Sequence, residues 1–225
     1  MSGRIAVFAA SSLTDAFADI ADAFLDVHPS ADVVLNVGGS SRLAAQIAEG
    51  APADVYAAAD SDSMADLVEA GDAADTPVTL ATNTSQIIVA SGNPLGLAGL
   101  GDLADPELVV VVCAVQVPCG SYAAQILDNA GVDLTPDSYE QNVKAVATKV
   151  TSGEADAGIV YVTDVGAAGD AADGVVIPPD VNVTASYPMV VTDGAANPVG
   201  GRAFVDFVLG EVGQDILEQY GFGPP

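Results

Sequence analysis

Alternating strands and helices predict an α/β fold of two lobes for this chain of 225 residues. Residues 5–70 run strand, helix, strand, helix in close succession, which favours parallel strands joined by right-handed crossovers. A second unit begins after a change of pattern near residue 82, and its fully apolar run 108–112 is typical of a central parallel strand. We expect lobe I to comprise residues 1–82 and 188–225, lobe II residues 83–187, and two crossover hinges near 82 and 187.

The elements of lobe I follow from apolar periodicity. Strands are expected over residues 5–9, 33–37 and 55–58, and the segment 187–192 is again extended. Helices are expected from residue 13 onward, over 41–49, over 60–70 with Gly71 closing it, and over 202–220. The first helix begins behind Ser12, and Asp15 three residues later completes a capping box.

Lobe II shows the same alternation after a polar kink over residues 81–85. Strands are expected over 86–90, 108–112 and 157–162. Helices are expected over 121–130, where Pro118-Cys-Gly-Ser opens the helix, and over 139–150.

Two serine pairs are the most informative local feature. Ser11 and Ser12 follow the first strand, Ser40 and Ser41 follow the second, and each pair leads directly into a helix. A hydroxyl beside the unpaired N–H groups of a helix N-terminus favours an oxyanion, although serine also serves as an ordinary helix cap. Since the carboxyl ends of neighbouring parallel strands lie at one edge of a sheet, the two pairs predict a shared anion site there.

The charge balance limits what this site can use. The chain has 31 Asp and Glu residues against 5 Lys and Arg residues, for a net charge of -26. Nucleic-acid binding relies on phosphate neutralisation by cations, so we expect no nucleic-acid partner. An anion would have to be bound by short-range neutral donors, because the screening length of about 8 Å weakens the repulsion by the acidic surface.

The residues for catalysis or for a metal cluster are missing from the sequence pattern. The single histidine, His28, lies in a turn at the end of the lobe opposite the serine pairs, which argues against a Ser-His-Asp triad. A nucleophile elbow and a phosphate-binding Gly-Lys-Ser loop are also absent from the sequence. We therefore expect a binding protein rather than an enzyme, with no cofactor.

Six segments resemble, in order and spacing, the molybdate-binding proteins of bacterial ABC transporters. They are Val7-Phe-Ala-Ala-Ser-Ser-Leu, Gly39-Ser-Ser-Arg-Leu-Ala-Ala-Gln-Ile, Gly50-Ala-Pro-Ala-Asp-Val, Val117-Pro-Cys-Gly, Gly158-Ile-Val-Tyr and Tyr220-Gly-Phe. The resemblance implies a two-lobed periplasmic-binding-protein type II fold, each lobe a mixed, mainly parallel sheet flanked by helices, which closes over molybdate or tungstate.

The resemblance also implies which residues bind the oxyanion. They are the hydroxyls of Ser12, Ser40 and Tyr161 and the backbone N–H groups of Cys119 and Val143. Ser11 and Ser41 are second choices, because each pair leaves a one-residue ambiguity. The metal is contacted through the oxyanion oxygens only. This chain departs from the family pattern at Cys119, where alanine is usual, and at Gly38-Gly39.

An all-donor site favours fully deprotonated anions, because the O–H of hydrogen phosphate would meet no acceptor. Sulfate presents only acceptors too, so its exclusion is implied only by the resemblance. A binding protein for sulfate or ferric iron is the alternative. The expected setting is extracytoplasmic, with a membrane permease as partner and a monomeric protein; no export signal precedes the first strand.

The two cysteines lie close together in the sequence. Cys113 comes just after the strand 108–112, and Cys119 comes just before a helix. A disulfide is compatible with this spacing and with an oxidising location, and two buried free thiols are the alternative. We expect the disulfide to hold the loop that presents the Cys119 N–H.

Overall fold

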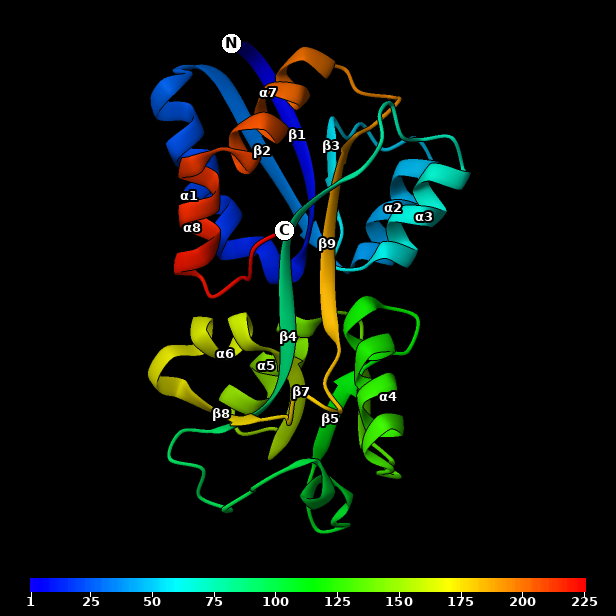
Figure 1. The fold of residues 1–225 in the computed structure, drawn as a ribbon, viewed down its shortest axis with the longest axis vertical. Coiled ribbons are helices and arrows are strands. Elements are labelled where there is room, and N and C mark those ends of the chain that lie inside the picture. Colours follow the sequence, from blue (N-terminus) through cyan, green and yellow to red (C-terminus); the bar gives the residue numbers. More distant parts are fainter. The chain divides into compact units, whose positions relative to one another are not determined.

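The computed structural model describes residues 1–225 as two compact units. Unit 1 comprises Met1–Thr82 and Ser186–Pro225, and unit 2 comprises Asn83–Ala185. The chain passes between them through two strands, β4 (Val78–Ala90) and β9 (Thr184–Val191), which are labelled in Figure 1. None of the helices has the length and apolar character needed to cross a bilayer.

The sheet of unit 1 is mainly parallel. Its strands are β1 (Ser2–Ala10), β2 (Ser30–Gly38), β3 (Val55–Ala57) and the unit-1 part of β9. β1 is central and parallel to β2 and β3, whereas β9 is antiparallel to β3. Ala10 pairs with Gly38 and Ala9 with Ala57, so the three parallel strands end at one edge of the sheet.

Helices cover both faces of this sheet (Figure 1). α1 (Thr14–Val27), α7 (Pro198–Leu209) and α8 (Glu211–Gln219) pack on one face, and α2 (Ser40–Ala48) and α3 (Ser61–Glu69) on the other. The ring of Phe24 lies edge-on to Phe204 and Phe207 of α7, with centroids 5.5 and 5.4 Å apart. These aromatic contacts hold α1 against α7.

The sheet of unit 2 is mixed. β5 (Val110–Cys113) is parallel to β6 (Ser138–Glu140) and β7 (Ala157–Tyr161), and β4 is antiparallel to β7 and β8 (Ala172–Val176). The helices are α4 (Pro118–Ala130), α5 (Val143–Thr151) and α6 (Val162–Ala168). Short 3-10 helices span Leu100–Ala104 and Gly169–Ala171. All four residues of β5 are buried, as its apolar run predicts.

The structure corrects two predictions about where elements begin. The helix expected over 139–150 begins at Val143, because Asn142 caps it by accepting a hydrogen bond of 3.0 Å from the Ala145 N–H. Tyr139 lies instead in β6, where it pairs with Val112. The kink expected over 81–85 is also wrong, since β4 runs unbroken through it.

The helix expected over 202–220 is two helices, α7 and α8, and the reason is Gly210. This residue is extended, with φ -77° and ψ 170°, and it ends α7 and caps α8 at once. Gly213 lets α8 turn back closely, because a Cβ there would lie 2.4 Å from the carbonyl oxygen of Val208. The sequence prediction also missed α6 and β8.

We predict that Glu140→Gln weakens the acid dependence of stability. Burial alone would raise the pKa of Glu140, but hydrogen bonds from Lys149 and Ser138 outweigh it and lower the pKa below the ordinary 4.5. A lowered folded-state pKa adds stability above the unfolded pKa, and this stability is lost as the pH falls through the folded pKa. The loss should stay below about 1 kcal/mol because the pair is partly exposed. Urea unfolding from neutral pH down to pH about 3 tests this prediction. The exposed Glu107→Gln variant is the control. If the free energy of unfolding of Glu140→Gln fell with pH as steeply as that of the parent, the prediction would be contradicted.

Candidate oxyanion-binding site

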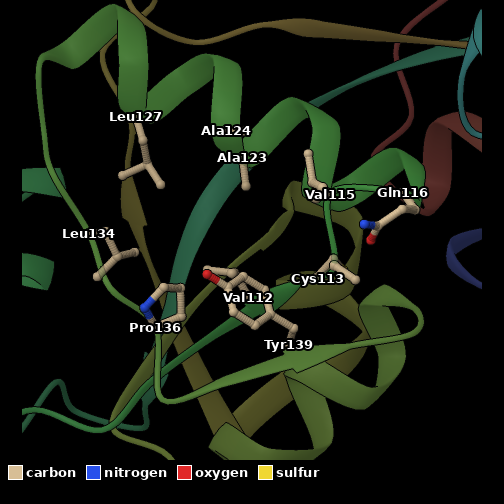
Figure 2. A pocket seen from close by; sticks show the side chains of 12 residues that line it. Val112, Cys113, Val115, Gln116, Ala123, Ala124, Leu127, Leu134, Pro136 and Tyr139 are labelled. Atoms are coloured by element: carbon tan, nitrogen blue, oxygen red, sulfur yellow. The ribbon is translucent and has the colours of Figure 1, made fainter.

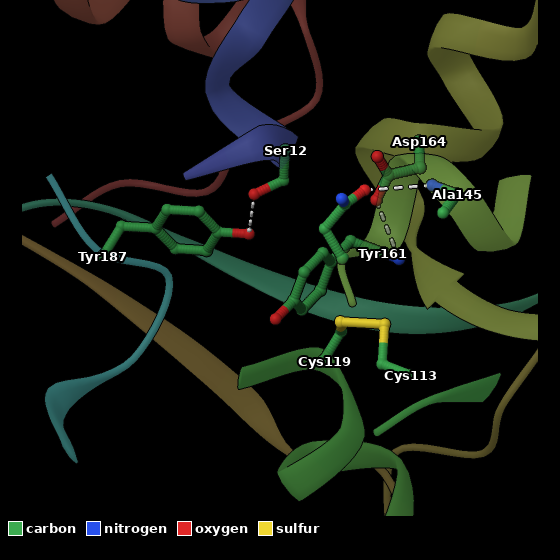
Figure 3. The surroundings of a disulfide bond; sticks show 8 residues. Ser12, Cys113, Cys119, Ala145, Tyr161, Asp164 and Tyr187 are labelled. Atoms are coloured by element: carbon green, nitrogen blue, oxygen red, sulfur yellow. Dashed lines mark hydrogen bonds between the residues drawn. A yellow bond between two sulfur atoms is a disulfide. The ribbon is translucent and has the colours of Figure 1, made fainter. Parts of the chain in front are cut away.

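Ser12 lies at the carboxyl end of β1, inside a 3-10 helix that spans Ser11–Leu13. Its side chain is buried, and its Oγ lies 3.0 Å from the hydroxyl of Tyr187 on β9 (Figure 3). The predicted capping box of Ser12 and Asp15 is wrong: the cap position of α1 is Leu13, and no side chain caps it. The 3-10 turn therefore leaves the Ser12 hydroxyl available for a partner other than its own helix.

Ser40 lies at the carboxyl end of β2 and is the first residue of α2. It is 1% exposed, its Oγ accepts a hydrogen bond of 3.0 Å from the Ala59 N–H, and its carbonyl accepts one of 3.0 Å from the Tyr56 hydroxyl. An N–H group can only donate, so the hydroxyl hydrogen of Ser40 is left for another acceptor. No side chain caps α2 either, so the alternative that the serines serve only as caps is wrong.

Ser11 and Ser41, the second choices for the ligand contacts, have other hydrogen-bond partners. Ser11 is buried, and its carbonyl accepts a hydrogen bond of 2.6 Å from Thr14 Oγ1. Ser41 Oγ lies 3.4 Å from Ser63 Oγ on α3. Ser12 and Ser40 stay the first choices in unit 1, as the motifs predict, and burial favours Ser40 over Ser41, which is only half-buried. The hydrogen bonds of Ser40 and Ser41 do not separate the two, because Ser41 also has a partner that can donate to it.

Tyr56 and Asp60 form buried hydrogen bonds near Ser40 and at the start of α3. Burial, with a further contribution from nearby Asp60, raises the pKa of Tyr56 well above its usual range, so that its hydroxyl stays protonated and donates to Ser40. Burial also raises the pKa of Asp60, which caps α3 by accepting from the Ser63 N–H at 3.1 Å. A Cβ at Gly38 would lie 2.7 Å from Arg42 Nη2, the end of a flexible side chain that can move aside, so the structure gives no steric reason for glycine there.

Cys119 is the second residue of α4, directly after Pro118, and forms a disulfide with Cys113 (Figure 3). N–H groups in the first turn of a helix have no partner within the helix. The turn packs closely on the end of β5, because a Cβ on Gly120 would lie 2.0 Å from the carbonyl oxygen of Ala114. Glycine at position 120 is therefore required for this placement of the Cys119 N–H.

Val143 and Tyr161 follow the two strands parallel to β5. Val143 opens α5 three residues beyond the end of β6, and Tyr161 is the last residue of β7. The buried ring of Tyr161 lies edge-on to Tyr122 of α4. The Tyr161 N–H donates to Asp164 Oδ2 at 3.2 Å (Figure 3). Since β5, β6 and β7 are mutually parallel, Cys119, Val143 and Tyr161 come to the same edge of the unit 2 sheet.

Unit 2 also contains a cavity of about 480 Å³ between α4 and the β5–β6 edge (Figure 2). Its wall is mostly apolar, and Leu127, Leu134 and Tyr139 surround it. Cys119, Val143 and Tyr161 do not line it. This cavity therefore lies apart from the three residues of unit 2 that are expected to bind the oxyanion.

Two α/β units joined by two strands, each with helix N-termini and hydroxyls at the carboxyl edge of its sheet, define the class of solute-binding proteins. Residues 5–223 match the model of the bacterial extracellular solute-binding protein family, and the chain belongs to this family. The family and fold class expected from the motifs are thus confirmed.

Individual relatives agree with this assignment. The chain is 41% identical to the molybdate-binding protein ModA of Mycobacterium tuberculosis, over 98% of this chain and 85% of that protein. The periplasmic molybdate-binding protein of Azotobacter vinelandii has a similar fold, with a TM-score of 0.84 and 22% identity over 98% of this chain and 99% of that one. The sulfate-binding protein SubI of Mycobacterium tuberculosis has a TM-score of 0.87 at 18% identity, covering 99% and 87%. The last two likenesses concern the fold alone.

We predict that the Cys113–Cys119 disulfide stabilises the loop without contacting ligand. It closes a short loop, with a sequence separation of 6, and a loop of this size adds about 2 kcal/mol to stability. The variant Cys113→Ala/Cys119→Ala should lose about that much in urea unfolding, and unfolded, unreduced parent protein should show no free thiol. Two free thiols would contradict the bond, and abolished anion binding by Cys119→Ala would show that its side chain makes the contact.

Proposed function

We propose that this chain captures molybdate or tungstate outside the cytoplasm and delivers it to the membrane permease of an ABC transporter. The observation that carries the proposal is the hydrogen bonding of Ser40. Its hydroxyl oxygen accepts from a backbone N–H, so its hydrogen is left to donate to a ligand. ModA of Mycobacterium tuberculosis, a molybdate-binding protein that is 41% identical to this chain, supports the choice of anion. The family supports the extracytoplasmic location.

The proposed donor set comprises the hydroxyls of Ser12, Ser40 and Tyr161 and the N–H groups of Cys119 and Val143. All of these groups are neutral, and hydrogen bonds from neutral donors to an anion are about twice as strong as those between neutral groups. A dianion can therefore be held without a cationic side chain, which suits a protein with a net charge of -26. Hydrogen phosphate would be disfavoured because its O–H would meet no acceptor.

We further propose that donors from both units bind one anion and that binding brings the units together. Closure about the crossings in β4 and β9 should reduce the radius of gyration. Small-angle scattering with and without molybdate measures this change, and the Ser12→Ala/Ser40→Ala variant, which should no longer close at the same molybdate concentration, is the control. Identical curves for the parent protein in the two conditions would contradict closure.

A thermal-shift series against molybdate, tungstate, sulfate, phosphate and ferric iron tests the function. A ligand that binds only the native state stabilises it by RT ln(1 + [L]/Kd), about 4 kcal/mol at a thousandfold excess over Kd. Molybdate and tungstate should raise the unfolding temperature, and phosphate should leave it unchanged. Equal shifts with phosphate and molybdate would overturn the all-donor site.

Sulfate is the second candidate, because the fold of a sulfate-binding protein matches this chain with a TM-score of 0.87. Sulfate is also fully deprotonated, so only the size of the site separates it from molybdate. A larger thermal shift with sulfate than with molybdate would favour it. Ferric iron has less support, since the structure contains no group of three or more His, Cys, Asp or Glu side chains arranged to hold a metal ion.

A further inference from the structure

The two proposed serine ligands are held by different kinds of partner. Ser40 Oγ accepts from the Ala59 N–H, a group that can only donate, so Ser40 keeps its hydrogen to donate to a ligand. Ser12 Oγ instead lies 3.0 Å from the Tyr187 hydroxyl, and a hydroxyl can donate or accept. The direction of this second hydrogen bond therefore decides whether the Ser12 hydrogen is used within the protein or is left for the anion.

The structure places Tyr187 firmly. Its side chain is fully buried, and its ring lies edge-on to Phe222, with centroids 5.3 Å apart and planes at 81°. Tyr187 is the second residue of unit 1 after the chain returns on β9, so both it and Ser12 belong to unit 1 (Figure 3). A ring held by such packing keeps its hydroxyl oxygen at one position beside Ser12.

We propose that Tyr187 is a positioning residue for the oxyanion: its hydroxyl donates to Ser12 Oγ and so leaves the Ser12 hydrogen to be donated to the anion. This inference rests on the proposed function, because a Ser12 hydroxyl that donates its single hydrogen to the anion can only accept from Tyr187. With Tyr187 donating, Ser12 and Ser40 are equivalent, since each accepts from the protein and donates to the ligand.

Loss of the Tyr187 hydroxyl should therefore weaken molybdate binding. In Tyr187→Phe the Ser12 hydroxyl is free to turn, so molybdate should bind about threefold to tenfold more weakly, the usual range for one neutral hydrogen bond. The packing on Phe222 is kept because phenylalanine retains the ring.

A double-mutant cycle by calorimetry separates this role from a merely structural one. Molybdate is titrated into the parent protein, Tyr187→Phe, Ser12→Ala and the double variant. If Tyr187 acts through Ser12, Tyr187→Phe should change molybdate affinity by less than about twofold once Ser12 is alanine. Tyr220→Phe is the matched control: the Tyr220 hydroxyl donates to Asp19 at 2.7 Å, and its removal should leave the molybdate affinity unchanged.

The outcomes are distinct. A loss in Tyr187→Phe that persists in full beside Ser12→Ala would overturn the inference, as would an unchanged molybdate affinity in Tyr187→Phe. Those results leave the proposed function intact, provided that the parent protein binds molybdate. Failure of the parent to bind any molybdate would overturn the proposed function and this inference together.

Discussion

Replacing Ser12 or Ser40 by alanine should weaken molybdate binding by about 1.5 to 3 kcal/mol in each case, or roughly tenfold to 150-fold. Each substitution removes a hydroxyl that donates to a charged ligand, and such bonds are stronger than those between neutral groups. The Ser40 variant should also lose about 1 kcal/mol of ligand-free stability, because the Ala59 N–H loses its acceptor. Calorimetric titration and urea unfolding measure the two effects separately.

Ser41→Ala is the matched control for these variants. Its hydroxyl faces Ser63 on α3, so its loss should reduce affinity much less than the loss of Ser40. A greater loss in Ser41→Ala than in Ser40→Ala would move the ligand contact to the neighbouring residue. Unchanged affinity in both Ser12→Ala and Ser40→Ala would contradict the site.

Replacing Asp54 by alanine should destabilise the fold by about 2 to 5 kcal/mol, because two partly buried N–H groups lose their charged acceptor. Asp54 is 3% exposed, and its carboxylate accepts from the Ala6 N–H at 2.7 Å and from the Asn197 N–H at 2.6 Å. It thereby joins β1 to the residue that caps α7. The aspartate of the segment Gly50-Ala-Pro-Ala-Asp-Val is thus a structural residue of unit 1.

Urea unfolding of the ligand-free protein measures this loss. The exposed Asp32→Ala variant is the control and should stay within about 0.5 kcal/mol of the parent, as surface substitutions usually do. Asp54→Asn should also destabilise, since an amide has one oxygen and cannot accept from both N–H groups through separate oxygens. An Asp54→Ala protein as stable as the parent would show that both N–H groups find other acceptors.

Local patterns were sufficient to predict most of the fold and the neighbourhoods of the site residues. Apolar periodicity is a short-range property, so strands such as β1 and helices such as α3 were predicted near their observed bounds. Parallel strands end at one edge of a sheet, and this rule alone brings Ser12 near Ser40 in unit 1. That these residues bind the anion stays a prediction.

The interactions that the sequence did not predict depend on contacts between distant residues or on single-residue backbone geometry. The sequence around Ser12 predicts a helix cap, whereas its hydrogen-bond partner in the structure, Tyr187, lies 175 residues away. The break between α7 and α8 depends on the extended conformation of Gly210, which apolar spacing does not encode. Asn142, an ordinary N-cap residue, was a usable signal for the start of α5, but the helical spacing of the preceding residues outweighed it.

A crystal structure of the protein with tungstate tests the central claim most directly, because the metal gives an anomalous signal that locates the anion independently of any model. We predict one strong peak whose oxyanion accepts hydrogen bonds from Ser12 Oγ, Ser40 Oγ, the Cys119 and Val143 N–H groups and the Tyr161 hydroxyl, with no lysine or arginine side chain in contact. A peak elsewhere, or an anion held by a cationic side chain, would contradict a site built from neutral donors.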